Sequence, residues 1–121
     1  MRHPRLLIVD DDPDMAVVLG ARFKARRFEV DCAVDGVEAV AAFGRRKPDV
    51  VLLDLHTPRL DGLAVMRAMR EQDPAARIII VTGDTDRSLA EQLLDDGAND
   101  VLIKPIDLDD LDAAVETNLP R

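Results

Sequence analysis

Short apolar runs alternate along the chain with longer stretches in which apolar residues recur every three or four positions. Five of the runs have the length of a strand, and all except the one near residues 28–33 are wholly apolar, which is typical of strands buried on both faces of a parallel sheet. They lie near residues 6–9, 28–33, 50–53, 78–81 and 101–103. Because a segment with helical spacing follows each run, the pattern predicts an α/β domain with helices on both faces of the sheet.

Aspartates mark the expected starts of these helices, since their side chains can accept hydrogen bonds from the free N–H groups of a first turn. The expected N-caps are Asp12 before Pro13, Asp35 three residues before Glu38 in a pattern resembling a capping box, Asp61 and Asp107. The second and third helices should end near Phe43 and Glu71. The fourth should end at Asp95 before a left-handed Gly97, and the last near Asn118.

The length and composition fit a single globular domain and exclude several classes of protein. The chain has 121 residues, of which 1–4 and 119–121 are expected to be terminal flanks of one domain. With three Phe and no Tyr or Trp, it offers no stacking platform for bases or a flavin ring. The net charge of -8 argues against direct binding of nucleic acid. No apolar run is long enough to span a membrane, so membrane binding is not expected.

The single cysteine and the distribution of charge add two expectations. Cys32 excludes an internal disulfide, fits a reducing cytoplasm and is expected to pack in the core. Basic residues cluster where the first two helices end, where they complement the helix dipoles; a docking role for the first cluster is the lesser alternative. The clusters are Arg22, Lys24, Arg26 and Arg27, and Arg45, Arg46 and Lys47. Acids prevail from Asp84 to Asn118.

Polar side chains follow four of the predicted strands directly. Asp10 and Asp11 follow the first, Asp54 the third, Thr82 the fourth and Lys104 the fifth. Taken alone, each is weak, because an acid can be solvated, a threonine can bond the backbone and most lysines are surface residues. Together they are specific, because the carboxyl ends of parallel strands share one edge, where ligands bind in open α/β sheets. Three carboxylates, a hydroxyl and an ammonium are the groups that Mg²⁺ and a transferring phosphoryl group require.

With these residues the chain resembles the receiver domain of two-component response regulators, including the single-domain chemotaxis regulators. The resemblance covers about Leu6 to Asn118. It rests on the segments 9–11 (VDD), 54–62 (DLHTPRLDG), 81–83 (VTG) and 104–105 (KP). It implies a flavodoxin-like (βα)5 fold, a doubly wound five-stranded parallel sheet in the order 2-1-3-4-5.

The resemblance implies a role for each residue of the pocket. Asp54 would be the nucleophile that takes a phosphoryl group from a phosphohistidine. Thr82 and Lys104 would hold the phosphoryl oxygens as charge develops, and the Lys104–Pro105 bond would be cis. Mg²⁺, or Mn²⁺, would bind directly to the carboxylates of Asp11 and Asp54 and to the backbone carbonyl of His56. Asp10 would bind it mostly through water. Without metal, the proximity of three carboxylates predicts at least one raised pKa.

The implied function is a cytoplasmic signalling switch in a phosphorelay. Its expected partners are a sensor histidine kinase or phosphotransfer protein, and an output domain or downstream protein. It would promote only its own phosphorylation and dephosphorylation, so no enzyme activity is expected.

A phosphorylation-independent interaction module on the same fold is the main alternative. An aspartate-nucleophile phosphatase would carry an acid/base Asp where this chain has His56. A flavin-binding protein is disfavoured because Asp10, Asp11 and Asp12 would repel phosphate.

Three features concern the output of such a switch. Val101 stands where the family usually has Tyr or Phe, so the aromatic half of the family's switch is missing, or the domain signals through another face. His56 and Asp84 flank the expected pocket mouth; they could pair across it, or be two exposed polar side chains. The acidic stretch from Asp84 onward predicts a monomer, or a weak dimer that does not use the fourth helix, fifth strand and fifth helix.

Overall fold

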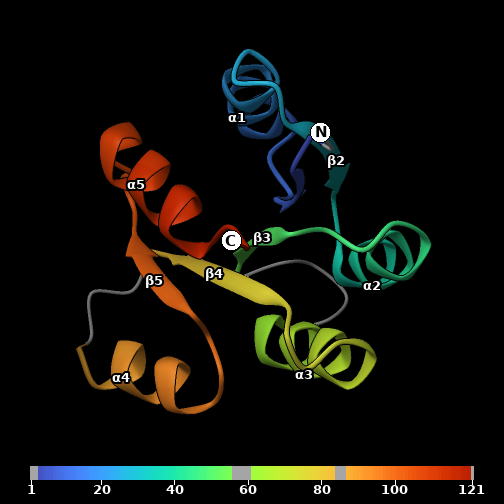
Figure 1. Ribbon diagram of the computed structural model, residues 1–121. Coiled ribbons are helices and arrows are strands. Elements are labelled where there is room, and N and C mark those ends of the chain that lie inside the picture. Colours follow the sequence, from blue (N-terminus) through green and yellow to red (C-terminus); the bar gives the residue numbers. More distant parts are fainter. Residues whose placement is uncertain (1–2, 56–60, 84–86, 121) are drawn as a thin grey trace.

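Five strands form one parallel sheet at the centre of the molecule (Figure 1). The computed structural model describes residues 3–55, 61–83 and 87–120. The strand order is β2-β1-β3-β4-β5. The strands are β1 (Arg5–Val9), β2 (Glu29–Ala33), β3 (Val50–Asp54), β4 (Arg77–Thr82) and β5 (Asp100–Ile103). The strand order implied by the family resemblance is therefore confirmed, and each strand lies within a residue or two of its predicted range.

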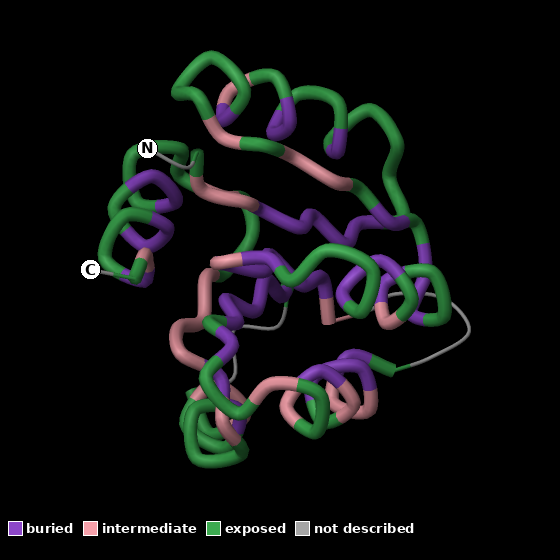
Figure 2. The backbone as a smooth tube through the Cα atoms, turned by 45° about the vertical axis from the view of Figure 1, so that its right-hand side comes forward, coloured by how far each residue is buried: buried purple, intermediate pink, exposed green. Residues whose placement is uncertain are grey.

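Helices cover both faces of the sheet. α1 (Pro13–Lys24) and α5 (Leu108–Asn118) lie on one face, and α2 (Gly36–Arg45), α3 (Gly62–Gln72) and α4 (Arg87–Asp95) lie on the other. Neighbouring residues of a strand serve opposite faces: Leu6 and Ile8 pack with α1 and α5, whereas Leu7 and Val9 pack with α2, α3 and α4. The buried segments in Figure 2 follow the central strands and the inner sides of the helices.

The helix starts follow the predicted caps. The side chain of Asp35 accepts a hydrogen bond of 2.8 Å from the backbone N–H of Glu38, and that of Asp61 accepts one of the same length from Ala64. Asp12 and Asp107 cap α1 and α5 in the same way. α4 has the predicted bounds and is followed by Gly97 with a φ of +116°. α2 continues two residues beyond the expected Phe43. No helix among the described residues is long and apolar enough to cross a membrane.

The expectation that Cys32 packs in the core is wrong. Cys32 lies on β2, as expected, but its side chain is exposed. β2 is the edge strand of the sheet and has β1 as its one neighbour. A strand in this position is incompletely covered, so an apolar residue type on it does not guarantee burial.

The basic cluster at the end of α1 has a specific partner on α5. Arg22 donates two hydrogen bonds to Asp112, from Nε to Oδ1 over 2.9 Å and from Nη2 to Oδ2 over 2.6 Å. Arg26 Nη2 lies 2.7 Å from the same Oδ2, and Arg26 Nη1 lies 3.6 Å from a carboxylate oxygen of Glu116. The helix-dipole interpretation still fits Lys24, in the last turn of α1, but it is incomplete for Arg22 and Arg26. These ion pairs join α1 to α5.

Candidate functional site

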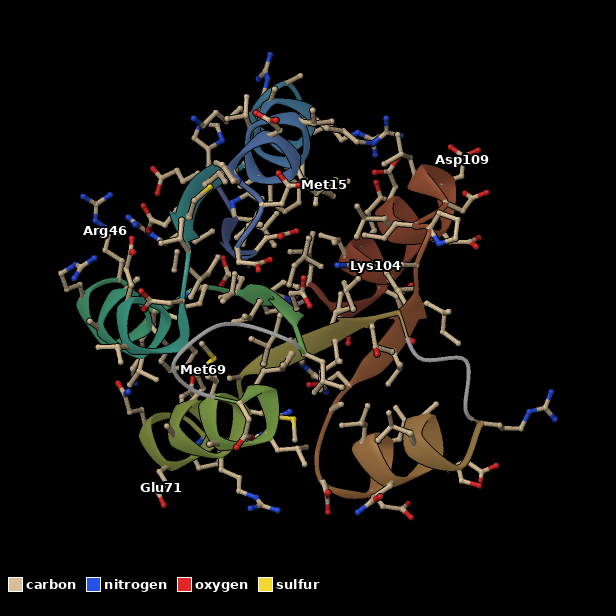
Figure 3. All side chains as sticks on the ribbon, turned by 180° about the vertical axis from the view of Figure 1, so that it is seen from behind. Met15, Arg46, Met69, Glu71, Lys104 and Asp109 are labelled. Carbon is tan, nitrogen blue, oxygen red and sulfur yellow. The ribbon has the colours of Figure 1, made fainter. Side chains whose placement is uncertain are left out.

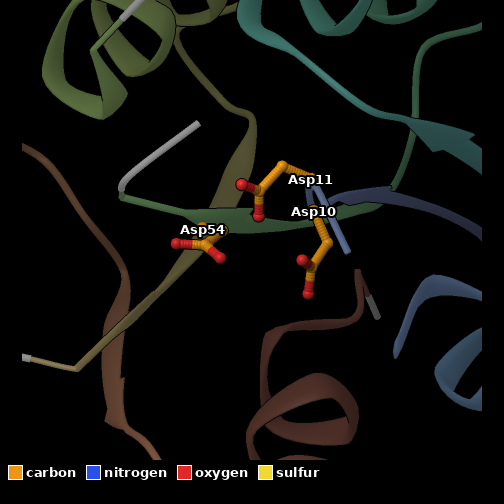
Figure 4. A group of neighbouring side chains, drawn as sticks. All are labelled: Asp10, Asp11 and Asp54. Carbon is orange, nitrogen blue, oxygen red and sulfur yellow. The ribbon is translucent and has the colours of Figure 1, made fainter. Parts of the chain in front are cut away.

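Three carboxylates meet at the carboxyl ends of β1 and β3. Asp10 and Asp11 directly follow β1, and Asp54 is the last residue of β3. One carboxylate oxygen from each residue lies within 4.8 Å of the other two. Figure 4 shows the three side chains converging on one space. Asp10 and Asp54 are buried, at 6% and 4% exposure, whereas Asp11 is exposed, so the cluster is open to solvent on one side. The sequence predicted this convergence.

Backbone hydrogen bonds connect the segments that carry the site. The N–H of Leu55 donates to the carbonyl of Val81 over 3.0 Å, which ties the end of β3 to β4. The N–H of Lys104 donates to the carbonyl of Thr82 over 2.8 Å, which ties β5 to β4. Thr82 ends β4 and is buried at 1% exposure. The predicted hydroxyl therefore belongs to the same edge of the sheet as the carboxylates.

Lys104 contacts the carboxylate expected to be the nucleophile. Its Nζ donates a hydrogen bond of 2.8 Å to Oδ2 of Asp54. This hydrogen bond, with the nearby charges of Asp54, Asp10 and Asp11, raises the pKa of Lys104, so the ammonium remains charged. Figure 3 shows Lys104 near the middle of the molecule. The Lys104–Pro105 peptide bond is cis, as the resemblance implies.

Asp10 occupies the least favourable electrostatic position in the cluster. Burial raises its pKa most, and the charge of Asp54 raises it further. A hydrogen bond of 2.9 Å from the N–H of Asp12 to Oδ1 of Asp10 partly opposes the increase. The expected raised pKa is therefore confirmed, although loss of hydration contributes more than repulsion between the carboxylates. A cation beside Asp10 would offset both effects.

The donor set fits a hard divalent cation. Mg²⁺ prefers carboxylate oxygens, needs only a few of them and keeps several waters. Asp10, Asp11 and Asp54 provide such oxygens close together on an open rim. The predicted carbonyl ligand, from His56, lies outside the described residues, and so does the predicted pairing of His56 with Asp84; both stay predictions.

A close contact made by Gly62 shapes the chain near Asp54. The N–H of Gly62 donates to the carbonyl of Leu55 over 3.1 Å. A Cβ at residue 62 would lie 2.8 Å from both the Cα and the carbonyl oxygen of Leu55, a distance that real structures do not tolerate. Sequence reasoning included Gly62 in the family motif without assigning it this contact. Its signal was the pair Asp61-Gly62, a cap followed by the smallest residue.

Val101 packs inward on β5. It is half-buried and lies against the core cluster beneath α2, α3 and α4, as does Leu89 of α4. The position at which the family resemblance implies an aromatic ring is thus filled here by a smaller residue packed against the core. Whether the domain signals through another face stays a prediction.

The fold and the acid cluster define a flavodoxin-like α/β protein with an acidic pocket at the carboxyl ends of its strands. The sequence-family model named response regulator receiver domain matches residues 6–116. The chain belongs to this family and is a receiver domain of two-component systems. It is 36% identical over 115 residues to regulatory protein AtoC of Escherichia coli, covering 95% of this chain and 25% of AtoC. It is 36% identical over 118 residues to transcriptional regulatory protein PrrA of Mycobacterium tuberculosis, covering 98% of this chain and 51% of PrrA.

Solved structures give the same assignment. The receiver domain of Francisella response regulator 1452 matches with a TM-score of 0.90 and 28% identity over 96% of both chains. A chain of the CheX-CheY-BeF3-Mg²⁺ complex of Borrelia burgdorferi matches with a TM-score of 0.88 and 30% identity, over 94% of this chain and 87% of that one. The chain spans between a quarter and about half of the length of the two curated relatives named above.

Proposed function

We propose that Asp54 is the phosphoryl acceptor of a signalling switch. The observation that carries this proposal is the contact between Lys104 Nζ and Asp54 Oδ2, beside the carboxylates of Asp10 and Asp11. A buried carboxylate at the end of a central strand, with an ammonium already in place, has the groups that acceptance of a phosphoryl group requires.

In the proposed step, a carboxylate oxygen of Asp54 attacks phosphorus and forms an O–P bond. The P–N bond of a phosphohistidine breaks, and the leaving imidazole nitrogen keeps the electron pair. Lys104 is already within reach of Asp54, so its ammonium can move to a phosphoryl oxygen as negative charge grows there. Thr82, at the adjacent strand end, would provide a hydroxyl donor to another phosphoryl oxygen.

Asp10, Asp11 and Asp54 are the proposed holders of Mg²⁺ or Mn²⁺, together with the carbonyl of His56. Bound there, the cation would neutralise acidic charge and polarise the phosphoryl oxygens. Burial and the charge of Asp54 raise the pKa of Asp10, and a cation beside its carboxylate would favour the charged form. The CheX-CheY complex of Borrelia burgdorferi, which contains BeF3 and Mg²⁺, gives independent support from a relative.

The proposed donor is a sensor histidine kinase or a phosphotransfer protein, and the proposed compartment is a reducing cytoplasm. The relatives AtoC and PrrA are longer regulatory proteins, which supports a partner in the form of an output domain or a separate downstream protein. The domain would accept one group and change partners instead of turning over a metabolite, so we do not propose enzyme activity. The net charge of -8 makes direct contact with nucleic acid unfavourable.

The test is intact mass after incubation with a small-molecule phosphodonor and Mg²⁺. Wild type should gain one phosphoryl group, and Asp54→Asn should gain none. Asp61→Asn is a matched control, because it makes the same change at a carboxylate that caps α3, so it should be labelled like wild type. Equal labelling of wild type and Asp54→Asn would overturn the assignment of Asp54.

A phosphorylation-independent interaction module is the second candidate. The observation in its favour is the packing of Val101 in the core, where no aromatic ring is available to move. Absence of labelling in wild type that is folded and supplied with Mg²⁺ would favour this candidate.

A further inference from the structure

Helix α1 is apolar on its outer side as well as on its inner side. Its inner residues include Leu19 and Phe23, which are buried against the sheet. On the outer side, Val17 is 70% exposed and Val18 is 56% exposed, and Ala21 one turn further on is exposed too. A surface helix normally carries polar residues on the side away from the core, and one that is apolar all round is normally covered. The outer side of α1 therefore has the composition of an interface.

Shallow apolar grooves flank this outer ridge on both sides. One, of about 390 Å³, lies toward the edge strand β2 and is lined by Val17, Gly20, Ala21, Cys32 and Val34 among others. The other, of about 610 Å³, lies toward α5 and is lined by Met15, Val18, Ile106 and Leu108, with the acids of the site at one end. A ridge beside a groove lets two copies of one surface interlock, each inserting its ridge into the groove of the other.

The charges on the ridge are arranged for pairing with a second copy. Asp14, in the first turn, and Lys24, in the last, are both exposed. Residues 14, 17, 21 and 24 are separated by three, four and three residues, the spacing of the contact positions in a heptad repeat. When two such helices pair antiparallel across a two-fold axis, Asp14 faces Lys24 of the second copy and Val17 faces its Ala21. Opposite charges then meet at both ends around an apolar centre, and the two helix dipoles oppose one another favourably.

We infer that the outer side of α1 is a self-association surface, on which two copies of this chain pair as antiparallel helices about a two-fold axis. This surface lies apart from the acid-rich α4, and it meets α5 only at Leu108, in the groove beside Val18. Asp112 and Glu116 of α5 are already paired with Arg22 and Arg26, so those charges are committed within the molecule. The inference does not depend on phosphorylation of Asp54.

Sedimentation equilibrium of the 121-residue chain from micromolar to millimolar concentration should reveal a reversible dimer. Val17→Glu should weaken association by at least about a hundredfold, because it places two unpaired carboxylates in the apolar centre. Leu94→Glu is the matched control on α4, where Leu94 is 46% exposed, and it should leave association unchanged. A monomer at every concentration would overturn the inference, and so would dissociation by Leu94→Glu with no effect of Val17→Glu.

Charge exchange tests the antiparallel register itself. Asp14→Lys alone and Lys24→Asp alone should each be monomeric, because each would pair like charges at both ends of the interface. Mixed in equal amounts, the two variants should form a heterodimer, since both end contacts are then between opposite charges. Failure of the mixture to associate, with both variants folded, would overturn the register.

Cys32 provides a reporter within the proposed interface. It is the chain's single cysteine, is exposed and lines the groove beside α1. Alkylation of Cys32 should therefore slow as wild type is concentrated, while the rate for Val17→Glu should stay constant. If both rates stay constant and Val17→Glu instead impairs only labelling by a phosphotransfer protein, the surface serves a different helical partner and self-association is excluded.

Discussion

Asp10 and Asp112 are both buried aspartates, yet their surroundings shift their pKa values in opposite directions. Asp10, among other carboxylates, has a raised pKa, chiefly because it loses hydration. Asp112 has a lowered pKa, chiefly because Arg22 donates a hydrogen bond to it, with Arg26 adding its charge. Both are less than a tenth exposed, so burial alone does not set the sign of the shift. The difference separates a carboxylate that is paired within the fold from one whose charged form is disfavoured by burial.

The largest effect on stability is expected from removing the carboxylate of Asp112. Asp112→Asn leaves Arg22 and Arg26 without their shared charge, and it should lower the free energy of unfolding by about 2 kcal/mol. Asp109 is the matched control on the same helix, because its side chain is 99% exposed and lies 4.0 Å from Arg22. Figure 3 shows it at the outer end of α5. Asp109→Asn should cost less than about 0.5 kcal/mol. Equal losses in urea unfolding would contradict the difference drawn between paired and exposed acids.

A smaller effect of opposite sign is expected at the site. Asp10→Asn removes a charge that burial disfavours, and the new side-chain oxygen can still accept the hydrogen bond from Asp12. In the absence of divalent cations, this variant should be more stable than wild type, because it removes a charge that is disfavoured in the folded state; the cost of an incompletely compensated buried polar group, about 1 kcal/mol or more, sets the scale. Urea unfolding in EDTA measures it. A loss of stability would show that the charge of Asp10 is already compensated within the protein.

The stability differences of Asp112→Asn and Asp10→Asn from wild type should depend on pH in different ways. The folded-state pKa of Asp112 is below its unfolded value of about 3.9, so its stabilisation is complete above that value and is lost as pH falls further. The folded-state pKa of Asp10 is above the unfolded value, so the advantage of Asp10→Asn fades earlier, while pH is still falling toward 3.9. Unfolding of both variants and wild type across this acidic range checks the order. Loss of both differences over the same interval would contradict it.

Most of the fold could be predicted from sequence because its signals are local. The apolar runs, the caps Asp12, Asp35 and Asp107, and the glycine after α4 each act within a few residues, and all are found as expected. The site followed from topology, because residues that end parallel strands necessarily share an edge. The strand order itself came from the family resemblance.

Long-range features could not be predicted, because sequence signals act only over a few residues. The partner of Arg22 lies on α5, far along the chain, and no spacing rule joins the two residues. The exposure of Cys32 depends on β2 being the edge strand, and the strand order came from the family resemblance and not from the residues of β2. The dominant cause of the raised pKa of Asp10 is burial, which depends on how closely the surrounding elements pack.

The most direct test of the central claim is thermal unfolding as a function of Mg²⁺ concentration. Wild type should become more stable by about 1.4 kcal/mol for each tenfold increase above the dissociation constant. Asp112→Asn should start from a lower stability and gain the same increment, whereas Asp54→Asn should gain much less. The same gain in Asp54→Asn as in wild type would contradict the claim that these carboxylates form the cation site of a phosphoryl switch.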